Sequence, residues 1–266
     1  HDLLSGFGGS KKANNAAYNA SKKIKHVALS LTGEPIMYPK INELIEKFHK
    51  DEISTFLVTN AQYPEQIKNL KPITQLYISL DAATKDLLKE VDKPLFADYW
   101  ERLNKSLTYM KEKKHRTCIR LTMIKGINMK DVKNYAGMIK KADPDFIEIK
   151  AYTFVGASRE RLEMENMPLH EEVVEFSKLL KKYLEDYEIA SEHIPSRVIL
   201  IAKKKFKINN EWYTWINFPK FHKLALSKKE FSAEDYLLKT PKNFTGISGK
   251  GTMDYSKEKR LASDIQ

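Results

Sequence analysis

The sequence predicts an α/β fold in which a parallel β-sheet curves into a partial barrel with helices on its outer face. Short strand-like runs alternate with helix-length segments along most of the 266 residues, which is typical of βαβ units and of a parallel sheet. Within those runs polar and apolar residues alternate, whereas strands covered by helices on both faces are apolar throughout. One face of the sheet must therefore line a wet or ligand-filled lumen, which a barrel provides.

Six strands are expected, each followed by a turn and a helical segment, and six strands favour a partial barrel over a complete eight-stranded one. Prolines support the boundaries, since Pro39 and Pro64 stand in first helical turns and Pro144 follows a helical segment. The expected strands cover residues 26–31, 55–59, 75–80, 117–123, 146–150 and 197–202. The expected helices cover residues 39–50, 64–71, 84–91, 97–114, 130–142 and 169–187.

The third strand shows the alternation clearly. Tyr77 and Ser79 point to one side of the sheet, and Leu76 and Ile78 point to the other. The fourth and fifth strands divide in the same way. Because an unpaired buried polar group costs roughly 1–3 kcal/mol, the polar face requires partners, and a polar ligand inside the barrel is expected.

Polar residues, together with one glycine, stand at or after the carboxyl ends of five consecutive strands. Chemistry in α/β barrels takes place at these strand ends and in the loops that follow them. The sequence therefore predicts a site there, built from Thr32, Gly33, Glu34, Asn60, Ser79, Asp81, Arg120, Thr122 and Lys150.

The chain divides into three expected regions. Residues 1–25 resemble a linker from a missing upstream segment, and residues 26–221 form the barrel with a C-terminal hairpin. Residues 222–266 form an extension that ends in a mobile tail, because periodicity is lost after about residue 240. The hairpin, at 203–218, carries tryptophans that either stack on nucleic-acid bases or close one end of the domain.

Composition restricts the function classes. Forty-six Lys and Arg against 35 Asp and Glu give a net charge of +11, which suits a polyanionic partner such as nucleic acid, although a lysine-rich composition alone explains it too. The single cysteine, Cys118, excludes an internal disulfide framework and a self-contained thiolate metal site. The sequence has neither a membrane-spanning apolar run nor a signal-peptide core, so a cytoplasmic protein without a membrane partner is expected.

Six blocks of sequence, in order, resemble one enzyme family. The family is the radical S-adenosylmethionine (radical SAM) enzymes that make 4-demethylwyosine in tRNA, and the resemblance runs from about residue 26 to residue 221. It implies a partial (β/α)6, TIM-like barrel of the radical SAM type that uses S-adenosylmethionine and a [4Fe-4S] cluster. The blocks are "ALSLTGEP", "YPKINELIEKFHK", "TFLVTNA", "QLYISLDA", "TCIRLTMIKGIN" and "FIEIKAYTFVG".

The resemblance also implies a reaction. Such an enzyme, a lyase, acts on N1-methylguanosine 3′ of the anticodon of tRNA-Phe and adds two carbons of pyruvate, in the wybutosine pathway. Its electron donor is a flavodoxin or a similar protein, or an upstream domain that carries FMN, and a monomer is expected. Two alternatives stay open: a noncatalytic, basic tRNA-binding barrel, and a different radical SAM reaction.

Residue roles follow from the resemblance. Gly33 and Glu34 match the element that holds the ammonium of S-adenosylmethionine, and Asn60, Ser79 and Asp81 stand where relatives contact its ribose or sulfonium end. Arg120 is expected to pair with the cofactor carboxylate. Lys150 is the candidate catalytic lysine that holds pyruvate as a Schiff base, with anion binding and an ion pair with Glu148 as alternatives.

One departure separates this sequence from the family. The three-cysteine CxxxCxxC motif that binds the cluster is absent, so no metal ligand is predicted in this chain. Either the chain is an N-terminally truncated piece of a longer protein, inactive as given, or it is a homologue that has lost catalysis. Three segments with basic or aromatic residues are candidates for a tRNA surface: residues 111–116, 158–163 and 203–218.

Overall fold

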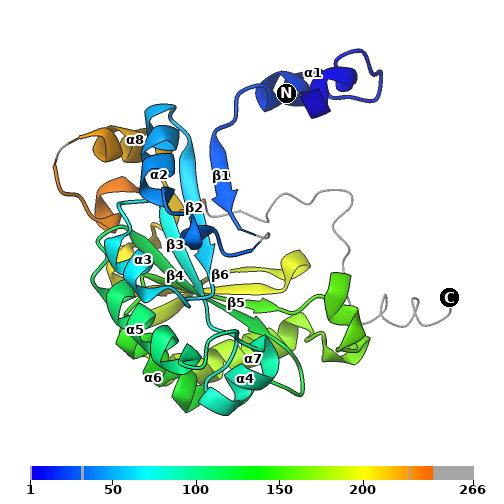
Figure 1. Cartoon of the computed structure of the whole chain (residues 1–266), viewed down its shortest axis with the longest axis vertical. Helices are drawn as coiled ribbons and strands as arrows, with labels where there is room; N and C mark the ends of the chain where they lie inside the picture. The colour runs from blue at the N-terminus through cyan, green and yellow to red at the C-terminus, as the bar shows by residue number, and fades with distance from the viewer. Residues whose placement is uncertain (1, 31–32, 228, 242–266) are drawn as a thin grey trace.

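A seven-stranded sheet forms the centre of the protein in a computed structural model that describes residues 2–30, 33–227 and 229–241. The first five strands are parallel and adjacent in chain order, and the sheet order is β1-β2-β3-β4-β5-β7-β6. The sheet is open, with β1 at one edge and β6 at the other (Figure 1). Its strands are β1 (His26–Leu29), β2 (Ser54–Thr59), β3 (Gln75–Ser79), β4 (Arg116–Met123), β5 (Phe146–Ala151), β6 (Tyr187–His193) and β7 (Val198–Lys203).

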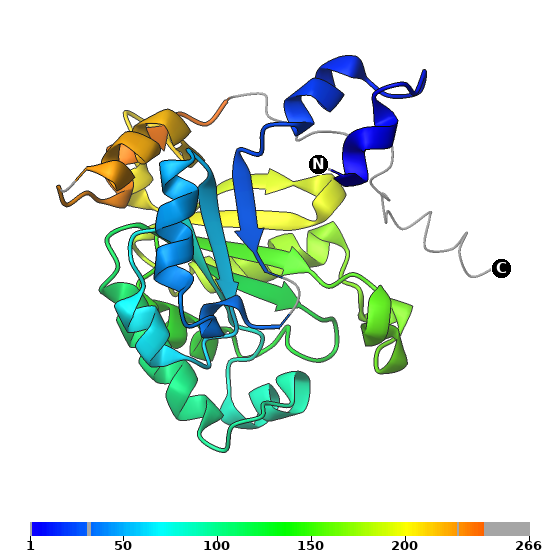
Figure 2. The same ribbon diagram turned by 45° about the horizontal axis from the view of Figure 1, so that its top comes forward.

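Helices connect the parallel strands and cover one face of the sheet, as Figure 2 shows from a second side. Every helix in the described ranges is too short or too polar to cross a membrane. The connecting helices are α2 (Ile41–Lys50), α3 (Pro64–Asn69), α4 (Lys85–Asp92), α5 (Tyr99–Lys111), α6 (Val132–Ala142) and α7 (His170–Lys181). Short 3-10 helices are at Pro35–Met37, Gly156–Glu160, Met164–Asn166, Ile194–Ser196, Lys204–Phe206 and Ala233–Tyr236.

The predicted alternation is confirmed. Leu76 and Ile78 of β3 are fully buried in the core between sheet and helices, as are their counterparts in β4 and β5. Tyr77 and Ser79 lie on the opposite face of the sheet, which is the lumen side. The helix-covered face is the hydrophobic core, and the other face is left for polar groups and ligands.

The last part of the predicted sheet is wrong in direction. Residues 197–202 were expected to form a sixth parallel strand, but β7 runs antiparallel to β5, with Ile147 opposite Ile201. The chain reaches β7 from β6, a strand that was not predicted and of which only Tyr187 falls in the helix expected at 169–187. Helix α7 ends at Lys181, and β6 and β7 form an antiparallel pair that completes the sheet. The barrel therefore has five parallel strands and a returning pair.

The predicted hairpin after β7 is present. Strands β8 (Lys207–Ile208) and β9 (Glu211–Trp212) pair across Asn209 and Asn210, whose φ angles of 50° and 62° suit the tight turn of a hairpin. A second small pair joins β10 (Trp215–Ile216) to β11 (Leu237–Leu238). These strands lie near the starts of the parallel strands, so the hairpin region closes that end of the barrel.

Two expected boundaries differ from the described structure. Helix α8 (Phe218–Leu226) runs across the boundary placed at residue 221, and Tyr236, in the predicted extension, is completely buried. Residues 1–25, expected as a linker, include a 3-10 helix at Asp2–Phe7 and the helix α1 (Asn15–Ser21). The predicted tail, and residues 31 and 32 of the first expected strand, lie outside the described residues.

Candidate active site

A cavity of about 670 Å³ lies at the carboxyl ends of the first three parallel strands. Five of the predicted cofactor-binding residues line it together, because the ends of neighbouring parallel strands meet at one edge of the sheet. These residues are Gly33, Glu34, Asn60, Ser79 and Asp81. We refer to this space as the strand-end cavity.

Gly33 contributes backbone conformation. Its φ angle of +68° is in the left-handed region, where a side chain is strained, although a Cβ atom would meet nothing within 4 Å. The chain turns here from β1 toward Glu34 and the 3-10 helix at Pro35–Met37. Gly33 therefore lets Glu34 reach the cavity.

Glu34 carries the most informative polar group of the cavity. Its Oε2 accepts a hydrogen bond from the backbone N–H of Asn60, at 2.9 Å. Its Oε1 is buried and has no hydrogen-bond partner among the described residues. Burial raises the pKa of this carboxyl group, even though the hydrogen bonds from Asn60 and Thr59 oppose the rise. A buried carboxylate with one unsatisfied oxygen is complementary to an ammonium group, and the amino group of S-adenosylmethionine has that chemistry.

Asp81 and Asp92 add two carboxyl groups to the same cavity. Burial raises the pKa of Asp81 to about 6. The pKa of Asp92 is also raised, by desolvation and by the negative charge of Asp81. Asn128 fixes the strand end, because its Nδ2 donates a hydrogen bond to the Asp81 carbonyl at 2.8 Å. These carboxylates can accept hydrogen bonds from hydroxyl groups such as those of a ribose.

Sequence reasoning missed Asp92 and Arg161, which also line this cavity. Asp92 is the last residue of α4, and Arg161 follows the 3-10 helix at Gly156–Glu160. Neither residue stands at a strand end, so no strand pattern marks them. Only the folding of the two loops over the strand ends brings them to the cavity.

Arg120 does not line the strand-end cavity. Its Nε donates to Glu148 Oε1 at 2.8 Å, and its guanidinium lies 4.6 Å from the centre of the Tyr77 ring. The predicted role of Arg120, pairing with the carboxylate of the cofactor, therefore competes with an ion pair inside the protein.

Lys150 is also outside the strand-end cavity. It lies opposite Thr122 of β4 and Val198 of β7, and its side chain is exposed. The described residues provide no hydrogen bond or ion pair to its ammonium group, since Glu148 is occupied by Arg120. The alternative of a Lys150–Glu148 ion pair is not observed.

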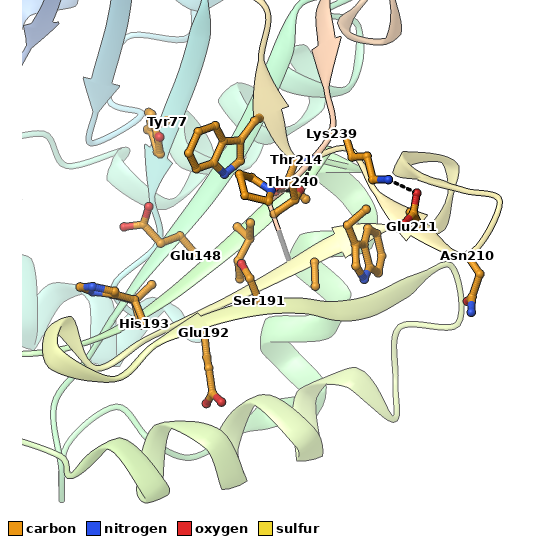
Figure 3. Close-up of a pocket in the computed structure, with 16 residues that line it drawn as sticks. Tyr77, Glu148, Ser191, Glu192, His193, Asn210, Glu211, Thr214, Lys239 and Thr240 are labelled. Atoms are coloured by element: carbon orange, nitrogen blue, oxygen red, sulfur yellow. Dashed lines mark hydrogen bonds and ion pairs between the residues drawn. The ribbon is translucent and has the colours of Figure 1, made fainter. Parts of the chain in front are cut away.

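A second cavity of about 800 Å³ lies on the lumen side of the sheet (Figure 3). Tyr77 and Glu148 border it from β3 and β5, and Ser191 and His193 border it from β6. Trp212 and Trp215 border it from the two small strand pairs β8–β9 and β10–β11. This position agrees with the alternative in which the tryptophans close one end of the domain. We refer to this space as the lumen cavity.

The residues of this chain do not provide the ligands of an iron-sulfur cluster. Cys118, the single cysteine, is buried in β4, and burial raises the pKa of its thiol well above the usual range, which disfavours the thiolate a cluster needs. Within the described ranges no group of three or more His, Cys, Asp or Glu side chains is arranged to hold a metal ion.

Two of the three candidate tRNA segments lie at the opposite end of the barrel from the strand-end cavity. Because β7 is antiparallel, Lys203 and Lys205 lie beside the starts of the parallel strands. They form ion pairs with Asp143 at 2.8 Å and with Asp145 at 2.9 Å. Residues 111–116 precede β4 at that same end, and Arg116 is buried there. Only the segment 158–163 follows a parallel strand, β5, at its carboxyl end.

Comparison with known proteins gives two family matches. Residues 13–139 match the radical SAM superfamily, and residues 141–203 match the family described as wyosine base formation. The first match contains all five predicted residues of the strand-end cavity. The second contains Glu148, Ser191 and His193 of the lumen cavity.

Individual relatives agree with these matches. The S-adenosyl-L-methionine-dependent tRNA 4-demethylwyosine synthase of Oryza sativa subsp. japonica is 50% identical over 244 residues, covering 89% of this chain and 37% of that protein. A solved structure of TYW1 with a lysine-pyruvate adduct bound is 37% identical, with a TM-score of 0.70, and covers 79% of this chain and 67% of that one. A crystal structure of archaeal TYW1 is 35% identical, with a TM-score of 0.64, and the match covers 79% of this chain and 68% of that one.

The chain spans about a third of the length of the curated relatives it matches. It covers about two thirds of each of the two TYW1 structures at more than 30% identity, and both family matches agree with them. The chain belongs to the tRNA 4-demethylwyosine synthase (TYW1) family of radical SAM proteins.

Proposed function

We propose that this chain provides the S-adenosylmethionine-binding and substrate-binding part of a tRNA 4-demethylwyosine synthase. The reaction would join N1-methylguanosine, 3′ of the anticodon of tRNA-Phe, with carbons of pyruvate, as a lyase of the wybutosine pathway. The observation that supports this most strongly is Glu34, whose buried and unsatisfied carboxylate oxygen lies in the strand-end cavity.

The residues of the chain suggest how the cofactor is held. Glu34 would accept a hydrogen bond from the ammonium group of S-adenosylmethionine, and the Asn60 N–H keeps the carboxylate oriented. Ser79 and Asp81 would bind hydroxyl groups farther along the same edge. Radical chemistry needs a reduced [4Fe-4S] cluster, whose cysteines are not in the printed sequence, and an electron donor such as a flavodoxin or an FMN-containing protein.

Lys150 is our candidate for the residue that receives pyruvate. One solved TYW1 structure contains a lysine-pyruvate adduct, and a lysine amine that is free of ion pairs can condense with a ketone and release water. The Lys150 ammonium has no partner among the described residues, and it lies on the lumen side of β5.

Calorimetric titration with two ligands tests the cofactor site. S-adenosylmethionine carries the amino-acid group, whereas 5′-methylthioadenosine lacks it. We expect Glu34→Gln to weaken binding of S-adenosylmethionine by about tenfold and to leave methylthioadenosine binding unchanged, because a charge-assisted hydrogen bond is worth about 1.5–3 kcal/mol. Glu43→Gln, at an exposed position of α2, is the matched control. Equal effects of Glu34→Gln on both ligands would contradict the assignment.

Nucleoside analysis of tRNA-Phe tests the reaction. Deletion of the gene should remove 4-demethylwyosine and its derivatives and leave N1-methylguanosine in their place. If the chain binds S-adenosylmethionine but the tRNA nucleosides do not change, the protein carries out a different radical SAM reaction or none.

A further inference from the structure

The lumen cavity lies directly beside the strand-end cavity. Tyr77 lines the first and Ser79 lines the second, and both are on the same face of β3. Two residues along a strand are about 6.6 Å apart. The two cavities therefore adjoin along the lumen face of β3.

The lumen cavity has the lining of a site for a flat aromatic group. Tyr77 borders it from the sheet, and Trp212 and Trp215 border it from the hairpin region. Stacking of a nucleobase on an aromatic side chain contributes about 1–3 kcal/mol. The volume of about 800 Å³ falls in the range of small-molecule sites and leaves room for a nucleoside.

Two side chains at the edge of the same cavity each keep one polar atom without a hydrogen-bond partner among the described residues. Glu148 uses Oε1 for Arg120, and no hydrogen bond to its Oε2 is present in the described ranges. The Nε2 atom of His193 is buried and has no hydrogen-bond partner there, while its Nδ1 pairs with Ser196 Oγ at 2.7 Å. Figure 3 shows Tyr77, Glu148 and His193 on one side of the cavity. A carboxylate oxygen accepts from an exocyclic amine, and an imidazole nitrogen donates to or accepts from a ring atom.

The radical SAM match supplies most of the strand-end cavity, and the match to wyosine base formation contributes mainly to the lumen cavity. The radical SAM match at 13–139 holds Gly33, Glu34, Asn60, Ser79 and Asp81 of the strand-end cavity. The match to wyosine base formation, at 141–203, contributes seven residues to the lumen cavity: Glu148, Ala190, Ser191, Glu192, His193, Val198 and Leu200. The match to wyosine base formation therefore supplies one wall of the lumen cavity, whereas Tyr77 lies in the radical SAM match and Trp212 and Trp215 lie in neither match.

We propose that the lumen cavity binds a purine base that is unstacked from an RNA loop, with Tyr77, Trp212 and Trp215 around the ring and Glu148 accepting from the exocyclic amine. Bases that are modified within a folded nucleic acid must leave the stack to reach the reacting groups. This inference rests on the proposed function, since it assigns the place of the tRNA base next to the cofactor.

Tryptophan fluorescence provides the test. In a Trp100→Phe background the emission comes from Trp212 and Trp215, because the chain has three tryptophans. The probes are two identical anticodon stem-loop RNAs, one with N1-methylguanosine 3′ of the anticodon and one with an abasic nucleotide there. We expect the first RNA to quench the emission and to bind at least tenfold more tightly than the second.

A cavity-filling variant provides the control. Ser191 lies opposite Leu200 on the lumen side of β6, so Ser191→Phe should abolish the difference between the two RNAs. Ile189→Phe, on the other face of the same strand, should preserve it. Equal binding of the two RNAs by the parent chain, or an undiminished difference in Ser191→Phe, would overturn the inference. Binding of S-adenosylmethionine to every variant tests the strand-end cavity separately, so failure of the proposed function would be recognised independently.

Discussion

Arg120 and Glu148 lie opposite each other on β4 and β5 and form an ion pair on the lumen side, with 2.8 Å between Arg120 Nε and Glu148 Oε1. The guanidinium also covers the Tyr77 ring. One pair thus connects three neighbouring strands at the wall of the lumen cavity, and it leaves Lys150 without a carboxylate partner.

Replacing one member of this pair should destabilise the protein more than replacing both. Arg120→Met leaves the Glu148 carboxylate, whose side chain is only 20% exposed, without its donor, so we expect the free energy of unfolding to fall by about 1–3 kcal/mol. Arg120→Met combined with Glu148→Met should recover part of this loss. Urea unfolding of the parent, the two single variants and the double variant measures the coupling free energy between the two side chains. Strictly additive effects would contradict the coupling.

The covalent role of Lys150 can be tested by trapping. Borohydride reduction in the presence of labelled pyruvate should label the parent chain, and Lys150→Met should lose the label. Lys130→Met, which removes another exposed lysine, is the control. Undiminished labelling of Lys150→Met would exclude the Schiff base and leave anion binding as its role.

Asp81 should make the protein less stable as the pH rises. The pKa is about 6 in the folded state and about 3.9 in an unfolded chain, so the folded state binds the proton more tightly. The free energy of unfolding should therefore fall between pH 4 and pH 6 and then level off. Asp81→Asn should remove a decline on the order of 1–3 kcal/mol in urea unfolding across this range, whereas Asp86→Asn, on the exposed side of α4, should not.

His49 should act in the opposite direction. Burial and the nearby His222 lower its pKa to about 4, and its Nε2 is hydrogen-bonded to Thr55 Oγ1 at 2.8 Å. The unfolded chain binds the proton more tightly, so stability should be fully present above about pH 6.5 and should be lost as the pH falls toward 4. His49→Gln should flatten this acid limb of the unfolding curve. A slope identical to that of the parent would show that other groups cause it.

Lys205, which follows β7, should matter for stability and not for RNA binding. Lys205 pairs with Asp145, a carboxylate that is only 8% exposed, so Lys205→Met should lower the free energy of unfolding by about 1–3 kcal/mol. Lys204→Met, which breaks no ion pair among the described residues, should change it by less than about 0.5 kcal/mol. RNA affinity over a salt series should be the same for both variants and the parent. A weaker affinity for Lys205→Met would restore these lysines as part of an RNA surface.

Most of the parallel sheet could be predicted from its alternation, because β3, β4 and β5 each bury one face under helices and turn the other to the lumen. The return through β6 could not. Its period of two is interrupted by an irregularity in register between Ile189 and Ser191, and the apolar stripe of α7 continues to Leu184, beyond the end of the helix. A bulge of this kind removes the pattern by which strands are recognised.

The strand-end cavity was predictable to the extent that strand ends build it. Glu34, Asn60 and Ser79 come together because parallel neighbours end at one edge. The positions of Asp92 and Arg161 depend on loop conformation, and the ion pair of Arg120 depends on the register of β4 with β5. Neither can be read from local sequence.

The burial of Tyr236 has a consequence for how the chain is made. Its hydroxyl accepts from the Arg116 N–H at 2.9 Å and donates to the Thr74 carbonyl at 3.1 Å, so it bridges the starts of β3 and β4 from a position 162 residues after Thr74. During synthesis this tyrosine must leave the ribosome before the two hydrogen bonds at the starts of β3 and β4 can form. A nascent chain that stops at residue 221 would contain β1 to β7 but would lack the hydrogen bonds of Tyr236 at the starts of β3 and β4. Contacts of such long sequence separation form late in folding.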